Sequence, residues 1–389
     1  MSRSRISQFA QPIRNLIRHE QFSSFLLLGV TVAALVLANS KWNSVYSAFL
    51  HHDFGVGPLS LSVHAWINDG LMALFFLLVG IEIKREIVFG ELTSFKKASL
   101  PFWGAVGGMV VPAAVFMLFN HGLPTADGWA IPMATDIAFA LAIFLFLGNR
   151  VPKALKVFLL ALAIIDDLGA ITVIAVFYTH SLAWLALGAA GLICLALFGL
   201  HHRRVQNPIP YLLLGTVLWF CVLQSGIHAT IAGVLLGFLM PLEAAHKTER
   251  WLHVPIIYGV MPLFSLANTG IALSPSLLHS LQEPLSLGIL FGLILGKPLG
   301  ILLFIGLALK LNWTQLPTAI RFNHLIIAAL LGGIGFTMSI FITTLAFDNP
   351  ALQDQAKLAI VLASTGSALF GYLYGSLLKD KPNNPPPAV

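Results

Sequence analysis

Charged residues are scarce in this sequence. Of its 389 residues only 10% are Asp, Glu, Lys or Arg, whereas 57% are hydrophobic. A soluble domain carries roughly 25% charged residues, so the composition excludes an ordinary soluble fold. The mean hydropathy of +0.86 indicates an integral membrane protein. Its apolar runs are long and continuous, which favours helices over the alternating strands of a membrane barrel.

Cysteine is scarcer still, and no basic patch stands out. Cys194 and Cys221 both lie inside apolar runs, which excludes a disulfide framework and a cysteine-based metal site. The net charge of +6 is spread between apolar segments. It therefore predicts a lipid bilayer as the partner, and no nucleic acid, because basic residues in the loops of a membrane protein set its orientation.

Windows of about 20 apolar residues predict about twelve transmembrane helices in one domain, residues 23–378. The predicted spans begin near residues 23, 66, 99, 127, 154, 182, 209, 226, 254, 286, 322 and 356. With these spans, of the 22 basic residues only Lys41 and Lys357 fall opposite the termini, and Lys297 lies within a span. The positive-inside rule then predicts a multi-pass protein with both termini in the cytoplasm.

Three short segments differ from the spans. Residues 1–22 place apolar side chains at helical spacing with arginines on other faces, which predicts an amphipathic helix on the cytoplasmic surface. Residues 55–63, GVGPLSLSV, combine a Gly-Pro turn signal with alternation, which predicts a short outer, periplasmic hairpin. The polar, proline-rich residues 379–389 predict a disordered cytoplasmic tail.

Four ionisable residues lie deep inside predicted spans: Asp136, Asp166, Asp167 and Lys297. At 1.5 Å per residue they lie about 14–18 Å from the ends of their spans, near the middle of a hydrocarbon core about 30 Å thick. A charge there costs at least ~2.5–3.5 kcal/mol, so intramembrane charges usually mark a functional site. One lysine cannot neutralise three carboxylates, so some must be protonated or must meet a cation.

Asp166 and Asp167 point about 100° apart on a helix, so they cannot both face one partner. One is expected to pair with Lys297 while the other faces a water-filled cavity. A carboxylate there holds a proton or a hard cation such as Na⁺, but hardly both at once. That exclusion is what an exchanger needs. The alternative is a buried ion pair that only ties helices together.

Two spans contain residues that interrupt helices. WAIPMATDIAFA (129–140) includes Pro132, Thr135 and Asp136, and LLGGIGFTMSIF (330–341) includes three glycines. Interrupted spans in corresponding places of two halves point to a transporter site. The ends of the half-helices would place partial charges near the midplane. We expect Asp136 to offset positive N-terminal ends and Lys297 to offset negative C-terminal ends.

Several motifs together resemble one known family. ATDIAFALA, ALAIIDDLGAI, FFLLVGIEIKREI, SGIHATIAGVLLGF, LGKPLGI and GGIGFTMSIFI are similar to the NhaA family of Na⁺/H⁺ antiporters, itself a standard example of transporters with interrupted helices. The resemblance implies an all-α fold of twelve helices with an inverted repeat, whose fourth and eleventh spans are unwound where they cross. It implies electrogenic exchange of internal Na⁺ or Li⁺ for a larger number of external protons across the bacterial inner membrane. It implies no bound cofactor and no enzymatic reaction.

The resemblance also assigns roles to residues. Asp167 would be the principal ion ligand, assisted by Asp166, and Asp166 would pair with Lys297 when no ion is bound. Thr135 and Asp136 would belong to the crossing of the interrupted spans. The outer hairpin would form a homodimer contact.

A second group is implied to switch the exchanger on at alkaline pH. Glu82, Arg85 and Glu86 share one helix face at the inner end of the second span, and two neighbouring carboxylates oppose each other's ionisation while an arginine favours it. The other members implied are Glu249, Arg250 and His253 before the ninth span, and His228 at the outer start of the eighth. Arg250 departs from the family pattern, which has a histidine there. The alternative for the residues at the inner ends is an ordinary positive-inside boundary.

Three rival functions fit less well. An intramembrane aspartyl protease needs two facing carboxylates, but the sequence has no Gly-x-Gly-Asp stretch and such a site has no use for Lys297. A channel favours rings of like groups, whereas these four residues are asymmetric in one chain. A proton-coupled symporter of a small solute on the same fold is the remaining alternative, and it would show more polar and aromatic residues at mid-depth.

Overall fold

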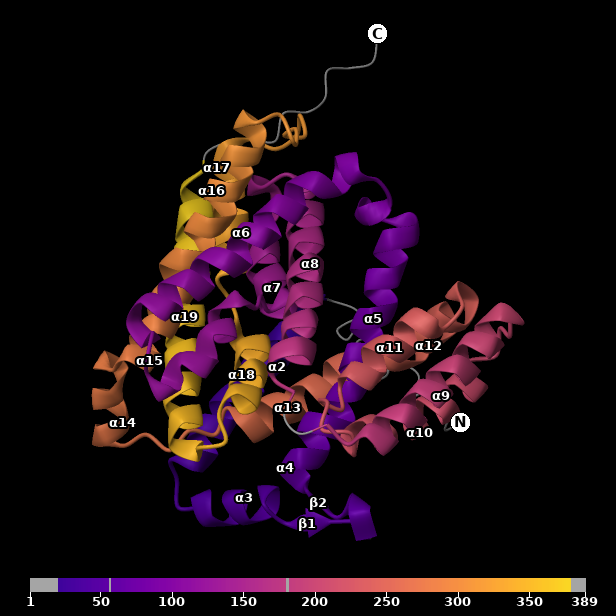
Figure 1. The fold of residues 1–389 in the computed structure, drawn as a ribbon. Coiled ribbons are helices and arrows are strands. Elements are labelled where there is room, and N and C mark those ends of the chain that lie inside the picture. The colour runs from indigo at the N-terminus through magenta and orange to yellow at the C-terminus, as the bar shows by residue number, and fades with distance from the viewer. Residues whose placement is uncertain (1–19, 56, 180–181, 379–389) are drawn as a thin grey trace, which may run out of the picture.

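The computed structural model describes residues 20–55, 57–179 and 182–378. The predicted disordered tail, and the predicted amphipathic segment up to residue 19, lie outside these residues. The described chain is almost entirely helical, with one two-stranded sheet at an end of the helical bundle (Figure 1).

Helical segments occupy the ranges of all twelve predicted spans. In the first half of the chain they are α2 (Glu20–Ala38), α4 (Val63–Ala65) continuing as η2 (Trp66–Leu71) and α5 (Met72–Phe89), α6 (Phe95–Asn120), η4 (Pro124–Met133) with α7 (Ile137–Leu147), and α8 (Lys153–Phe177). In the second half they are α9 (Trp184–His202), α10 (Pro208–Leu223), α11 (Ile231–Leu239), α12 (Leu242–Pro255) continuing as η6 (Ile256–Val260) and α13 (Met261–Asn268), α15 (Pro284–Phe291) continuing as η8 (Gly292–Gly296) and α16 (Lys297–Lys310), α17 (Phe322–Gly332) with α18 (Phe336–Ala346), and α19 (Pro350–Leu377). The remaining short helices are α3 (Asn43–Leu50), η1 (Gly57–Leu59), η3 (Glu91–Thr93), η5 (Gly148–Arg150), α14 (Pro275–His279) and η7 (Ser280–Gln282).

The helical membrane fold predicted from the sequence is therefore confirmed. The predicted count of about twelve spans holds only approximately. In the described residues six helices are long and apolar enough to cross a membrane by themselves, and up to nine spans result if each bent pair counts as one. The span predicted to begin near residue 226 is the short helix α11 (Ile231–Leu239). It begins later than predicted because the chain turns first. Gly226 in that turn has a φ of 83°, a value that glycine adopts without strain.

The sheet is a hairpin between the first two spans. β1 (Asp53–Phe54) pairs antiparallel with β2 (Leu61–Ser62), and Asp53 lies opposite Ser62, so the turn falls within the predicted residues 55–63. Gly55 has a φ of 137°, and a Cβ there would come within 2.0 Å of the Leu59 carbonyl oxygen. Only glycine fits this turn.

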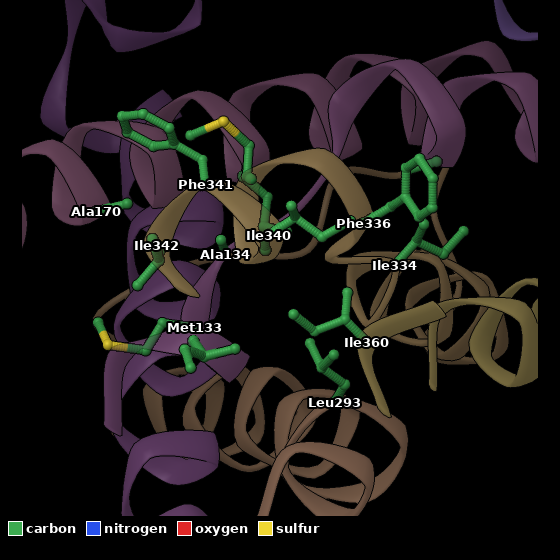
Figure 2. Packing of buried hydrophobic residues seen from close by; sticks show 14 of the residues in the cluster. Met133, Ala134, Ala170, Leu293, Ile334, Phe336, Ile340, Phe341, Ile342 and Ile360 are labelled. Atoms are coloured by element: carbon green, nitrogen blue, oxygen red, sulfur yellow. The ribbon is translucent and has the colours of Figure 1, made fainter. Parts of the chain in front are cut away.

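Two spans are interrupted, as the sequence predicts. The axes of η4 and α7 differ by 41°, and those of α17 and α18 by 44°. The two breaks meet, since the Asp136 N–H donates to the Ile334 carbonyl at 2.7 Å. Figure 2 shows hydrophobic side chains from both interrupted spans, η8 and α19 packed around this crossing, among them Ala134, Ile340, Leu293 and Ile360.

Close helix packing holds the span that carries Lys297. α16 lies against α6, where a Cβ on Gly107 would come within 2.1 Å of the Gly300 carbonyl oxygen and a Cβ on Gly300 equally close to that of Gly107. One turn before Gly300 the span contains the π-turn η8, in which the Lys297 N–H bonds to the Gly292 carbonyl. Pro298 follows and has no N–H to donate, which accounts for an irregular hydrogen-bond pattern there. π-turns are frequent at functional sites.

A smaller hydrophobic cluster joins α9, α10, α11 and α12 to α5, and these helices lie together to one side of α8 (Figure 1). The larger cluster surrounds the crossing and includes α6, α8 and α15 to α19. α8 belongs to the larger cluster and also contacts α5, and it carries the two adjacent aspartates.

Candidate ion-binding site

Asp166 and Asp167 lie in the middle of α8 and are 1% and 2% exposed. Asp166 Oδ2 is 3.0 Å from Lys297 Nζ and accepts a hydrogen bond of 2.7 Å from the Thr135 hydroxyl. The helix turns Asp167 away from this pair. Within the described residues, Oδ1 of Asp166 and Oδ1 of Asp167 are both buried without a hydrogen-bond partner. The site thus contains one carboxylate with a cationic partner, and two carboxylate oxygens able to accept a proton or a cation.

Lys297 is fully buried at the start of α16. Besides Asp166, its ammonium group donates to the carbonyl of Met133, which is the last residue of η4. Carbonyl groups at the C-terminal end of a helix carry partial negative charge. Lys297 therefore offsets a helix end in the way that the sequence predicts.

Asp136 bridges two helix N-termini. It is the N-cap of α7, where its Oδ1 accepts from the Phe139 N–H at 3.1 Å. Its Oδ2 accepts from the Thr337 N–H at 3.0 Å and from the Thr337 hydroxyl, in the first turn of α18. One carboxylate thus satisfies donors at the positive ends of both half-helices.

Hydroxyl groups lie at the C-terminal ends of the other two half-helices, where the single hydroxyl hydrogen of Thr135 is shared between Asp166 and the Gly332 carbonyl. Thr135 Oγ1 lies 3.0 Å from the Gly332 carbonyl at the end of α17, and the Ser339 hydroxyl donates to the Ile131 carbonyl near the end of η4 at 2.7 Å. Buried backbone groups at membrane depth need such partners. The structure thus brings together all five predicted site residues.

Sequence reasoning missed Thr337 and Ser339, although both lie in the motif GFTMSIF that it singled out for its glycines. Their signal is a pair of hydroxyl residues two positions apart directly after the interruption. Only the fold shows that one contacts the carboxylate of Asp136 and the other a carbonyl of η4.

Part of the predicted regulatory group meets near the last turns of α5. Arg85 forms an ion pair with Glu249 of α12 and lies 3.6 Å from Glu82. His246, which the sequence did not single out, has its Nδ1 3.7 Å from Glu249. The predicted members Arg250 and His253 have exposed side chains on α12. Glu86 is half-buried one position after Arg85.

His228 lies apart from that group. Its Nε2 is 3.6 Å from Oδ1 of Asp69, and its ring lies edge-on to Phe341 at 5.3 Å between centroids. α5 and α11 run in the same direction, since Gly233 contacts Ala73 and Gly237 contacts Ile81. Because His228 precedes α11 and Asp69 precedes α5, this pair lies at the opposite end of the two helices from Glu82.

Residues 14–374 match the model of a family described as Na⁺/H⁺ antiporter 1. The chain belongs to this family. Among its relatives, the Na(+)/H(+) antiporter NhaA 1 of Flavobacterium johnsoniae is 46% identical over 94% of this chain and 97% of its own length. The Na(+)/H(+) antiporter NhaA of Shewanella frigidimarina is 48% identical over 93% of this chain and 95% of its own. The predicted NhaA-family membership is confirmed.

A solved structure extends the comparison to the fold. The sodium proton antiporter MjNhaP1 from Methanocaldococcus jannaschii at pH 8 aligns with a TM-score of 0.51, covering 92% of each chain at 15% identity. At this identity the likeness concerns the fold alone. It supports the overall helical architecture seen here.

Proposed function

We propose that this antiporter-family protein exchanges cytoplasmic Na⁺ or Li⁺ for external H⁺ at Asp166 and Asp167. The observation that carries the proposal is the unequal environment of the two neighbours. Asp166 is bonded to Lys297 and Thr135, whereas Asp167 lies beside it, buried, with an unpartnered carboxylate oxygen. Such a site holds a proton or a hard cation, and binding one disfavours the other.

Lys297 supplies the competing positive charge. A cation at Asp167 recruits Asp166 as a second oxygen ligand, which weakens the bond between Asp166 and Lys297. Release of the cation lets Lys297 return to Asp166. Each carboxylate therefore needs a positive partner or a proton in every state of the cycle, because an uncompensated charge at this depth is costly.

The finer properties follow from the family resemblance and belong to the same proposal. Exchange is electrogenic, with more protons entering than cations leaving, and is activated at alkaline pH. Glu82, Arg85 and Glu249 are the group that we assign to activation, because an ion-pair network between α5 and α12 responds to ionisation of its carboxylates. The cargo is Na⁺, Li⁺ and H⁺. No cofactor and no enzymatic reaction are part of the proposal.

The protein is proposed to lie in the bacterial inner membrane with both termini in the cytoplasm. The hairpin of β1 and β2 would then be periplasmic and would contact a second copy to form a homodimer. Its exposed Phe54 and the outer edges of its two strands suit such a contact, because the edge of a sheet can pair with a strand of another chain.

The test uses everted membrane vesicles with a respiratory pH gradient and a fluorescent probe of that gradient. Na⁺, Li⁺ and K⁺ are added in turn from acidic to alkaline pH, for the wild type, Asp167→Asn and the matched control Asp348→Asn, whose carboxylate is exposed in a loop. We expect Na⁺ and Li⁺ to collapse the gradient in the wild type and the control, but not in Asp167→Asn. A folded wild type whose gradient no cation changes at any pH would overturn the proposal.

A further inference from the structure

The N-terminus of α18 has a donor that its own neighbouring residues do not satisfy. The first N–H groups of any helix lack partners within that helix, and a Ser, Thr, Asp or Asn at the N-cap usually accepts from them. The N-cap of α18 is Gly335, which makes no side-chain cap. This end of the helix faces Asp136 in the ion site.

Position 335 has no room for a capping side chain. A Cβ there would come within 2.2 Å of Ser339 Oγ and 3.1 Å of Leu293 Cδ2. Ser339 cannot move aside freely, because its hydroxyl donates to the Ile131 carbonyl at 2.7 Å. A local cap is therefore sterically excluded, and the acceptor must come from another segment.

α19 supplies that acceptor. Ser364 Oγ accepts a hydrogen bond of 3.1 Å from the Phe336 N–H, across 28 residues of sequence, and Ser364 is 4% exposed. The next N–H, of Thr337, donates to Asp136. The positive end of α18 is thus divided between a neutral hydroxyl and the carboxylate of the site.

We propose that Ser364 is a positioning residue of the ion site, and this inference rests on the exchange function proposed above. If Ser364 cannot accept, the Phe336 N–H loses its partner next to the Thr337 N–H that Asp136 already accepts from, and we expect the carboxylate of Asp136 to be drawn towards it. The backbone of Asp136 is bonded to Ile334, and its neighbour Thr135 is bonded to Asp166. The displacement therefore reaches the carboxylate that assists Asp167 in binding the cation.

The experiment compares Ser364→Ala, Ser364→Cys and Ser367→Ala in the intact protein. Cysteine keeps the shape of serine but is a weak acceptor. Ser367 is the matched control, because it lies one turn further along α19, is 1% exposed, and its hydroxyl has no hydrogen-bond partner among the described residues. The readouts are the apparent KM for Na⁺, the maximal exchange rate per folded protein, and the melting temperature in detergent.

We expect Ser364→Ala and Ser364→Cys to raise the KM for Na⁺ about three- to tenfold, as the loss of one hydrogen bond implies, with a maximal rate within about twofold of the wild type. Ser367→Ala should keep the wild-type KM. A purely structural role would lower the amount of folded protein or the maximal rate and leave KM unchanged.

The inference is overturned if Ser364→Cys has the wild-type KM, or if Ser367→Ala raises KM as much as Ser364→Ala. Those outcomes leave the exchange function intact, because the wild type still exchanges. A wild type that does not exchange Na⁺ for H⁺ overturns the proposed function and this inference together.

Discussion

Single residues in this site act for more than one helix. Asp136 accepts hydrogen bonds from α7 and α18, and Lys297 binds both a carboxylate of α8 and a carbonyl of η4. Each side chain thereby compensates a helix end and takes part in the ion site. A substitution that removes one polar group consequently affects both packing and ion binding, and only matched variants separate the two effects.

Two substitutions of Thr135 form such a matched pair of variants. The Thr135 hydroxyl lies 2.7 Å from Asp166 Oδ2 and 3.0 Å from the Gly332 carbonyl. Thr135→Val keeps the shape but removes the donor, so we expect exchange to slow by about tenfold or more, as for a lost hydrogen bond to a charged group. Thr135→Ser keeps the donor and should stay within about threefold of the wild type. Equal rates for the valine variant and the wild type in vesicles would contradict this role.

The sequence predicts one common depth for the charged residues but not all of their partners. Asp136, Asp166 and Lys297 could be placed near one level because hydropathy gives the span ends and the helix rise gives the depth. That Asp166 rather than Asp167 pairs with Lys297 came from the family resemblance. The contacts of Thr337 and Ser364 were missed because they depend on which helices meet, and no local pattern records that.

At the scale of elements, glycines set how closely helices approach. α6 and α16 touch at Gly107 and Gly300, one turn after Lys297. Small residues at helix contacts are the usual means of close packing in membranes. Here they hold the π-turn and Lys297 against the rest of the site.

Two glycines of α16 allow a test of whether glycine sets the close approach of α16 to α6. A Cβ on Gly300 would come within 2.1 Å of the Gly107 carbonyl, whereas a Cβ on Gly306 would meet nothing within 4 Å. We expect Gly300→Ala to lower the melting temperature in detergent by several degrees and to weaken exchange, because α16 must move away from α6. Gly306→Ala should be neutral or slightly stabilising, since alanine is favoured in helices by about 0.8–1.0 kcal/mol. Equal melting temperatures for the two variants would rule out this packing argument.

Over the whole molecule, titratable groups gather at opposite ends. Arg85, Glu82 and Glu249 lie at one end of α5, and His228 with Asp69 at the other. The ion site lies at the crossing of the two interrupted spans. The first group joins α5 to α12 and is the one to which we assign activation by alkaline pH.

Glu249→Gln tests that assignment. It removes a negative charge near Glu82 and frees Arg85 for Glu82, and both changes favour the ionised form of Glu82. If ionisation activates exchange, the pH of half-maximal activity falls by about half a unit or more. His253→Gln should leave the profile unchanged, because His253 is exposed on α12. A profile shifted by His253→Gln but not by Glu249→Gln would assign activation to the exposed residues instead.

The orientation of the molecule is open to a direct measurement. In a background without Cys194 and Cys221, single cysteines replace the exposed residues Phe54 in β1 and Gln315 between α16 and α17. We expect a membrane-impermeant thiol reagent to label Phe54→Cys in intact cells and Gln315→Cys only in everted vesicles, because basic loops stay in the cytoplasm. The reverse pattern would invert the proposed topology.

The crossing of the two interrupted spans also has a consequence for biosynthesis. The carboxylate of Asp136 bonds to Thr337, which is 201 residues later in the chain. The Met133 carbonyl bonds to Lys297, which is synthesised 164 residues later. At about 5–20 residues per second, a ribosome needs roughly 10–40 s to supply the partner of Asp136. During that time the first interrupted span is already made while its exposed backbone groups lack their final partners. The nascent protein therefore needs water, lipid headgroups or the insertion machinery to occupy those groups until the second half of the chain arrives.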